Sequence, residues 1–194
     1  MSKKPQVYVI AGPNGSGKTT FASEFLPKYA DCPAFVNADM IVRGLSGFSP
    51  DAVALKAGRL LLEQIETYAA KRITFAFETT LSGTNYLSRL RKLKKAGYSV
   101  HVFFLWIPDV RLSLARVASR VMMGGHGISE KVVRRRFHKG IGNFLKHYRR
   151  VTDSWMLFDN SEAIPRLIAE QKAGKTTVLD RKLYSQITIS VEEQ

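Results

Sequence analysis

Short apolar runs alternate along this chain with longer segments in which apolar residues recur at helical spacing. Runs typical of buried strands occupy residues 7–11, 34–37, 73–77, 99–107 and 155–158. Helices are predicted between these runs, at residues 17–26 (ending before Pro27), 49–71, 87–97, 108–125 and from 129 onward. Apolar strands that alternate with helices are typical of a parallel sheet covered on both faces. The pattern therefore predicts a single α/β domain over residues 1–194, with a mainly parallel five-stranded sheet flanked by helices.

Local signals add two features to this outline. Ser49, Pro50 and Asp51 favour a helix start, because they supply a side-chain cap, a first-turn proline and an acid near the positive end of the helix dipole. Near the C-terminus, strand-like residues 166–168 and 176–179 flank a turn at residues 172–175. We therefore expect a terminal hairpin at about residues 165–180.

The composition is that of an ordinary globular protein, with 45% apolar and 24% charged residues. A single cysteine, Cys32, excludes an internal disulfide and suits a reducing compartment. The longest strongly apolar run, residues 102–107, is far shorter than the roughly 20 residues that a bilayer span requires. No apolar signal core follows the first residues. We expect a cytoplasmic protein without a membrane partner.

The charge is strongly basic and unevenly distributed. Thirty Lys and Arg residues against 16 Asp and Glu residues give a net charge of +14. Between Arg111 and Arg150 there are eleven basic residues and one acid, Glu130. Such a concentration attracts the phosphates of a nucleotide, a nucleic acid or a carboxylate-rich partner, and composition alone does not choose among them.

One segment carries a specific chemical signal. Residues 12–19 match the phosphate-binding pattern G-x-x-x-x-G-K-[ST] at every fixed position, and they follow a predicted strand and open a predicted helix. Glycines let the backbone wrap around phosphate, and the helix N-terminus adds partial positive charge. In this pattern Lys18 reaches the β- and γ-phosphates of ATP, and the Thr19 hydroxyl is a ligand for Mg²⁺. The predicted nucleotide-binding residues here are Gly12, Pro13, Asn14, Gly15, Ser16, Gly17, Lys18 and Thr19.

Two acids follow predicted strands, at the sheet edge where open parallel sheets bind ligands. Asp39 comes after the second strand and Glu78 after the third. Phosphoryl transfer to a hydroxyl needs a carboxylate to accept the proton, and acids to hold Mg²⁺ or substrate. The alternative for each acid is a helix cap or a solvated loop. No Asn-Lys-x-Asp guanine-reading motif and no strand-terminal Asp-Glu pair occurs, which favours a kinase over a hydrolysing switch.

The basic segment predicts a lid at about residues 120–136. Two Arg-bearing helices are joined by a glycine-rich link, and such a lid would close over ATP and add positive charge during transfer. Arg120 and Arg136 are the candidate catalytic arginines, whereas Arg134 and Arg135 are expected to point outward. The alternative is that most of these arginines form a solvated face. His126 lies in the link, where a loop or substrate contact is favoured over metal binding because no second ligand stands at metal-binding spacing.

The order of these motifs resembles the zeta toxin-like family of P-loop kinases. The resemblance is carried by residues 12–20, 37–39, 77–82, Arg120 with 124–126, 134–137 and 158–161. It implies a P-loop kinase fold that binds ATP and Mg²⁺ at the carboxyl edge of the sheet. It also implies nucleotide contacts from Thr20 and, on the adenine side, Asn160, with Asp39 as base and Glu78 on substrate or metal. Zeta toxins phosphorylate a nucleotide-sugar and are held inactive by an antitoxin, which implies such a partner.

The leading hypothesis is an ATP-dependent kinase that transfers the γ-phosphate to a hydroxyl of a small molecule. A polynucleotide-end kinase is the first alternative, and it predicts nucleic-acid binding that falls steeply with salt. A non-catalytic ATP-binding regulatory module is the second, and it predicts ATP binding without turnover.

Overall fold

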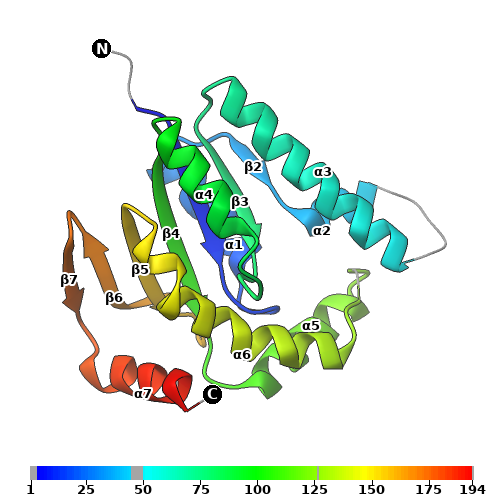
Figure 1. The fold of residues 1–194 in the computed structure, drawn as a ribbon. Coiled ribbons are helices and arrows are strands. Elements are labelled where there is room, and N and C mark those ends of the chain that lie inside the picture. The colour runs from blue at the N-terminus through cyan, green and yellow to red at the C-terminus, as the bar shows by residue number, and fades with distance from the viewer. Residues whose placement is uncertain (1–3, 45–49, 126, 194) are drawn as a thin grey trace.

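The computed structural model describes residues 4–44, 50–125 and 127–193 (Figure 1). Ser49 and His126, for which we predicted a helix cap and a loop contact, lie outside the described residues. The elements follow in the order β1 (Gln6–Ala11), α1 (Lys18–Tyr29), β2 (Ala34–Val36), α2 (Ala38–Gly44), α3 (Pro50–Ala70), β3 (Phe75–Thr79), α4 (Tyr86–Lys95), β4 (Ser99–Trp106), α5 (Val110–Met122), α6 (Glu130–Lys146), a 3₁₀ turn (Tyr148–Arg150), β5 (Ser154–Asp159), β6 (Arg166–Lys172), β7 (Lys175–Val178) and α7 (Arg181–Glu192).

The strands form one seven-stranded sheet in the order β2-β3-β1-β4-β5-β6-β7. The first five of these pair in parallel, as the alternation of strands and helices predicted. The predicted terminal hairpin is β6–β7, and it pairs antiparallel with β5. Because the hairpin covers the exposed hydrogen-bonding edge of β5, it joins the same sheet and raises the strand number from the predicted five to seven.

Helices cover the sheet unequally (Figure 1). Helices α3, α4, α6 and α7 share the larger core on one face, and α1 packs on a smaller aromatic cluster on the other. In the larger core, Leu61, Leu90, Phe144 and Ile187 of the four helices pack on strand residues such as Val9. Among the described residues, no helix is long and apolar enough to cross a membrane.

The end of the first helix differs from the sequence-based prediction. Helix α1 continues through Pro27 to Tyr29. The backbone N–H groups of Ala30 and Cys32 both bond to the carbonyl of Leu26, at 3.3 and 3.2 Å, so the final turn closes although proline lacks an N–H.

Two helices were not predicted. Helix α2 has seven residues, which is too short for a clear periodic pattern. Helix α7 did carry a signal, because Leu183, Ile187 and Val191 recur at helical spacing after Asp180, whose side chain caps the Leu183 N–H at 2.9 Å.

Candidate active site

The predicted phosphate-binding loop connects β1 to α1 in a conformation that requires glycine, as Gly12 and Gly17 show. Gly12 has a φ of 145°, and a Cβ there would lie 2.3 Å from the carbonyl oxygen of Leu105 on the neighbouring strand β4. Gly17 has a φ of 81° and directly precedes the first residue of α1. The glycines therefore let the loop turn tightly against β4 and present the open N-terminus of α1.

Polar side chains line the inside of this loop. Asn14, Ser16 and Lys18 are all buried. Among the described residues, Asn14 Oδ1 and Ser16 Oγ have no hydrogen-bond partner. Buried polar atoms without partners are costly, and the Ser16 hydroxyl can donate to a phosphate oxygen, so this hydroxyl beside a helix N-terminus fits a bound phosphate group.

Lys18 lies at the centre of the polar contacts. Its Nζ donates to the carbonyl oxygen of Pro13 at 2.8 Å and lies 3.5 Å from Glu78 Oε1. Burial lowers the pKa of Lys18, and the nearby carboxylates of Glu78 and Asp39 oppose that shift. The ammonium group is thus stabilised by two acids that we predicted to follow two different strands.

Glu78, Thr19 and Asn37 form a connected group beside Lys18. Glu78 Oε2 accepts hydrogen bonds from Thr19 Oγ1 at 2.7 Å and from Asn37 Nδ2 at 2.6 Å. Glu78 lies inside β3, one residue before its end, rather than after it as we predicted. Mg²⁺ prefers oxygen ligands and uses few protein side chains beside phosphate and water, so the paired Thr19 hydroxyl and Glu78 carboxylate fit that ion. No group of three or more His, Cys, Asp or Glu side chains suited to a metal occurs in the described part of the chain.

Asp39 is held in the first turn of α2. Its backbone N–H donates to Asn37 Oδ1 at 2.7 Å, and its Oδ2 accepts from Arg120 Nη1 at 2.9 Å. Both side chains of this ion pair are about one-third exposed, at 35% for Asp39 and 30% for Arg120. The contact brings the end of α5 across to α2, so the predicted base and a predicted lid arginine meet directly.

Arg136 reaches the same region from α6. It is half-buried, whereas Arg134 and Arg135 are exposed, as the helical spacing predicted. Burial and the neighbouring Arg135 lower the pKa of Arg136, and Asp39 opposes the shift. Arg134 instead pairs with Glu130 one turn earlier on its own helix, at 2.6 Å.

Most of these residues line one cavity of about 240 Å³. Its walls come from the phosphate-binding loop, α2, α3, the end of β3 with the loop that follows it, and α6. The lining residues are Asn14, Lys18, Asn37, Ala38, Asp39, Gly58, Leu61, Glu78, Thr79, Thr80, Ser82, Gly83, Asn85, Tyr86 and Arg136.

Three residues hold the loop in ways that sequence reasoning did not identify. Arg116 donates to the backbone carbonyls of Asn160, at 2.9 Å, and of Ser161. Asn160 Nδ2 donates in turn to the carbonyl of Ser16 at 2.6 Å, and Ser113 Oγ donates to the carbonyl of Asn14 at 2.6 Å. The predicted nucleotide residue Asn160 therefore contacts the loop backbone. The spacing of Arg116 four residues before Arg120 was the available signal for its position on the same helix.

A family comparison agrees with the order of these motifs. The Zeta toxin family model matches residues 1–184, which is nearly the whole chain. The chain belongs to the zeta toxin family. This chain is also similar in sequence to an uncharacterized protein of Haemophilus influenzae, 32% identical over 126 residues, which are 65% of this chain and 88% of that protein.

Solved structures resemble this zeta toxin family domain in fold. A crystal structure of AvrRxo1-ORF1:AvrRxo1-ORF2 with sulphate ions has a TM-score of 0.76 at 20% identity, and the pair was also solved with ATP. The match covers 96% of this chain and 64% of that one, so this chain spans less than two-thirds of that neighbour. The PezAT toxin-antitoxin system of Streptococcus pneumoniae has a TM-score of 0.62 at 12% identity, covering 99% of this chain and 88% of that one. At these identities the likeness establishes the α/β fold.

Proposed function

We propose that this protein is an ATP-dependent kinase that transfers the γ-phosphate of ATP to a hydroxyl group of a small molecule. The observation that carries the proposal is the single cavity in which Lys18, Asp39, Glu78 and Arg136 converge beside the phosphate-binding loop. Membership in the zeta toxin family supports an ATP-dependent kinase in general. The class of acceptor substrate and a role as a toxin are part of this proposal.

The loop residues 12–19 would hold the phosphates of ATP, with further contacts from Thr20. Backbone N–H groups and the α1 N-terminus supply partial positive charge, and Lys18 supplies a full charge at the β- and γ-phosphates. Thr19 and Glu78 would hold Mg²⁺, which, when bound, supplies further positive charge next to the transferring phosphoryl group. Glu78 would also keep the Lys18 ammonium aimed into the cavity, since the two groups lie 3.5 Å apart.

Asp39 would accept the proton of the acceptor hydroxyl. Asp39 lines the cavity and its Oδ2 is bonded to Arg120, so the acceptor hydroxyl would bind the other carboxylate oxygen or displace Arg120 from Oδ2. Arg120 would then bind the phosphates together with Arg136. Charge that develops on the phosphoryl oxygens is stabilised by such positioned cations, which is usually a large part of catalysis.

The acceptor would bind at the wall opposite the loop, where hydroxyl, amide and phenol groups are available from Thr80, Ser82, Asn85 and Tyr86. Such a wall suits a polyhydroxylated acceptor, and a nucleotide-sugar is the candidate from the family resemblance. An antitoxin partner is part of the same proposal, because a structural neighbour is a toxin-antitoxin system.

The test is to incubate the protein with γ-labelled ATP, Mg²⁺ and a metabolite extract, and to identify the labelled product. Lys18→Ala is expected to abolish labelling and weaken ATP binding, because the loop loses the charge that faces the phosphates. Lys28→Ala, at an exposed position of the same helix α1, is the matched control and should label normally. Equal labelling by Lys18→Ala would exclude the loop as the working site.

Oligonucleotides with free 5′-hydroxyl ends belong in the same assay. Labelling of the oligonucleotide in preference to small molecules would favour the polynucleotide-end kinase instead. ATP binding without transfer to any acceptor would favour the non-catalytic module.

A further inference from the structure

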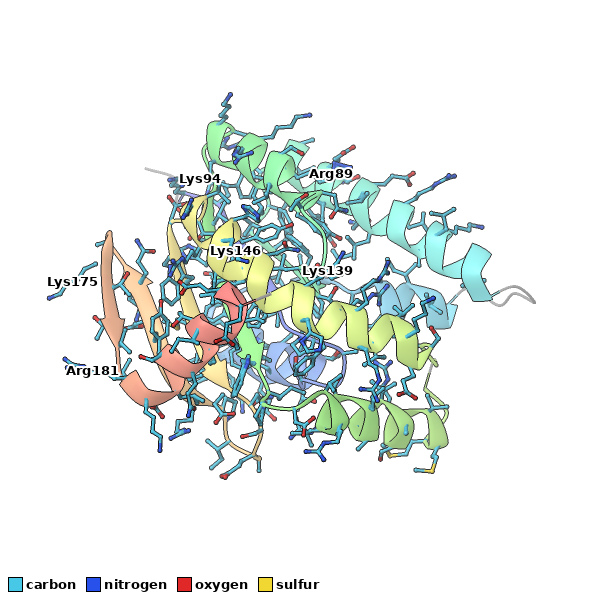
Figure 2. The ribbon with its side chains drawn as sticks, turned by 60° about the horizontal axis from the view of Figure 1, so that its bottom comes forward. Arg89, Lys94, Lys139, Lys146, Lys175 and Arg181 are labelled. Atoms are coloured by element: carbon cyan, nitrogen blue, oxygen red, sulfur yellow. The ribbon has the colours of Figure 1, made fainter. Side chains whose placement is uncertain are left out.

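A second basic region, whose side chains do not line the active-site cavity, lies on the outer side of α4 and α6. We define the basic face by Arg89 and Lys94 of α4 and by Lys139 and Lys146 of α6. Figure 2 shows these four side chains on one face of the molecule, with Lys175 and Arg181 further along beside β7 and α7. The sequence had indicated the excess of charge but had assigned the basic segment to a lid.

The two helices form one continuous surface. Both pack on the same core through Leu90, Leu93 and Phe144. Side chains of α6 and of the turn after it also reach the loop that precedes α4, because Asn143 Nδ2 donates to the carbonyl of Leu81 at 2.8 Å and Tyr148 Oη to that of Gly83 at 2.6 Å. The outward charges of α4 and α6 are therefore held at a fixed separation.

Carboxylates neutralise little of this charge. Helix α4 carries five basic residues and no acid, and α6 carries six basic residues and one acid, Glu130. Arg89 lies 3.6 Å from Glu66, and Lys94 lies 2.9 Å from Asp153, so these two cations are paired with carboxylates at the surface. Within the described residues, Lys139 and Lys146 are exposed and have no carboxylate within ion-pair distance.

Favourable interaction with the helix dipoles explains the positions of only some of these lysines. Lys92, Lys94 and Lys95 lie in the last turn of α4 and Lys146 in the last turn of α6, where cations favour the helix dipole. Lys139 lies in the middle of α6, where the dipole favours neither sign. None of the four side chains lines the active-site cavity, and Lys139 lies one helical turn after Arg136 on α6. Lys94 is also distant from catalysis along the strands, because it bonds to Asp153 just before β5, whereas Asp39 and Glu78 lie near the carboxyl ends of β2 and β3.

The kind of side chain favours nucleic acid over a protein partner. The exposed large apolar residues of the described chain include none from α4 or α6. Protein interfaces bury an apolar, aromatic-rich centre depleted of lysine, whereas nucleic-acid interfaces are polar and rich in Lys and Arg. We propose that the basic face binds the phosphate backbone of a nucleic acid, independently of the proposed kinase reaction.

The experiment measures fluorescence anisotropy of a labelled duplex of about 20 base pairs at several salt concentrations between about 50 and 200 mM. Duplex DNA, duplex RNA and single strands of matched length are separate arms, because all three present the same phosphate chemistry. The double variant Lys139→Glu/Lys146→Glu is expected to weaken binding about tenfold or more and to reduce the slope of log K against log salt by about 2.

The matched control is Lys28→Glu/Lys56→Glu, which makes the same charge change at exposed positions of α1 and α3 outside the basic face. It should change the affinity less than about threefold, since long-range attraction alone is screened by salt. Absence of binding to every nucleic acid, or equal loss in the two double variants, would overturn the proposal. Displacement of the duplex by poly-glutamate as effectively as by unlabelled duplex would also overturn it, because it would assign the face to acidic protein.

Two further measurements separate this proposal from the proposed function. Lys18→Ala should bind the duplex as the unmodified protein does, and Lys139→Glu/Lys146→Glu should retain transfer to the small acceptor. Loss of duplex binding in Lys18→Ala would place the nucleic acid in the active site and contradict a separate binding face.

Discussion

At the residue scale, Asp39 is held from two sides. Asn37 fixes its backbone N–H, and Arg120 binds its carboxylate at 2.9 Å. The ion pair links the proposed base to the proposed lid. A residue that both accepts a proton and pairs with an arginine can be tested by a change that keeps its shape but removes its charge.

Asp39→Asn should keep the affinity for ATP within a few-fold and lower transfer to the acceptor by a factor on the order of 10² to 10⁴, because the general base is lost. The measurements are the Kd for ATP and kcat with an identified acceptor. Asp31→Asn, an exposed position shortly before β2, is the control and should change neither. A collapse of ATP affinity would instead make Asp39 a structural or metal-holding residue.

At the scale of elements, α6 approaches the loop after β3 so closely that its glycines are not equivalent. A Cβ on Gly140 would lie 2.6 Å from the backbone carbonyl oxygen of Thr80, which lines the cavity. A Cβ on Gly142 would meet Val191 Cγ1 of α7 at 3.8 Å, an ordinary contact.

Gly140→Ala is therefore expected to lower the free energy of unfolding by about 1–3 kcal/mol through overpacking. Gly142→Ala should leave it unchanged or raise it by up to about 1 kcal/mol, since alanine favours the helix. The free energies of unfolding of both variants, measured by urea unfolding, test the two predictions. Equal values would mean that the contact between α6 and Thr80 is not tight in solution.

The lid prediction also belongs to this scale, because it depends on which side of α6 faces the cavity. Arg136→Ala should lower kcat by a factor on the order of 10² and change the KM for ATP much less, if its charge acts mainly during transfer. The exposed neighbour Arg135 is the control, and Arg135→Ala should change kcat by less than about twofold. Steady-state kinetics on both variants tests this prediction. Small and equal effects on kcat would mean that Arg136 of α6 does not take part in catalysis.

At the scale of the whole molecule, one half-buried histidine on the central strands is expected to make the stability of the fold depend on pH. His101 Nδ1 lies 2.7 Å from Ser154 Oγ and Nε2 lies 2.6 Å from Gln6 Oε1, so side chains from β4, β5 and β1 meet. Burial lowers the pKa of His101 below its ordinary value of 6.5; Asp153 opposes this and Lys4 adds to it.

A lowered folded-state pKa means that the unfolded chain binds this proton more readily. The stability contributed by neutral His101 is therefore complete above pH 6.5 and is lost as the pH falls below that value toward the folded-state pKa. We expect a drop in the free energy of unfolding across this window that is smaller in His101→Gln. The exposed His138→Gln is the control and should keep the full drop, and an identical pH profile in all three proteins would refute the assignment.

The sequence alone determined the features whose residues are contiguous. The phosphate-binding loop was predictable because one short segment supplies its glycines, Lys18 and Thr19. The spacing of these residues along the chain therefore determines how close they lie in the folded protein. The five parallel strands and most helices followed from periodicity, since burial of one face imposes it. The outward direction of Arg134 and Arg135 followed from the same rule.

Tertiary structure decided the contacts between segments far apart in the chain. The ion pair of Arg120 with Asp39 spans 81 positions, and the bond of Asn160 to Ser16 spans 144. No local pattern encodes such pairs, because they depend on the order in which the strands lie in the sheet. For the same reason, the sequence did not show that the hairpin extends this sheet, or that the charges of α4 and α6 form one face. Those features arise where separate elements pack on a common core.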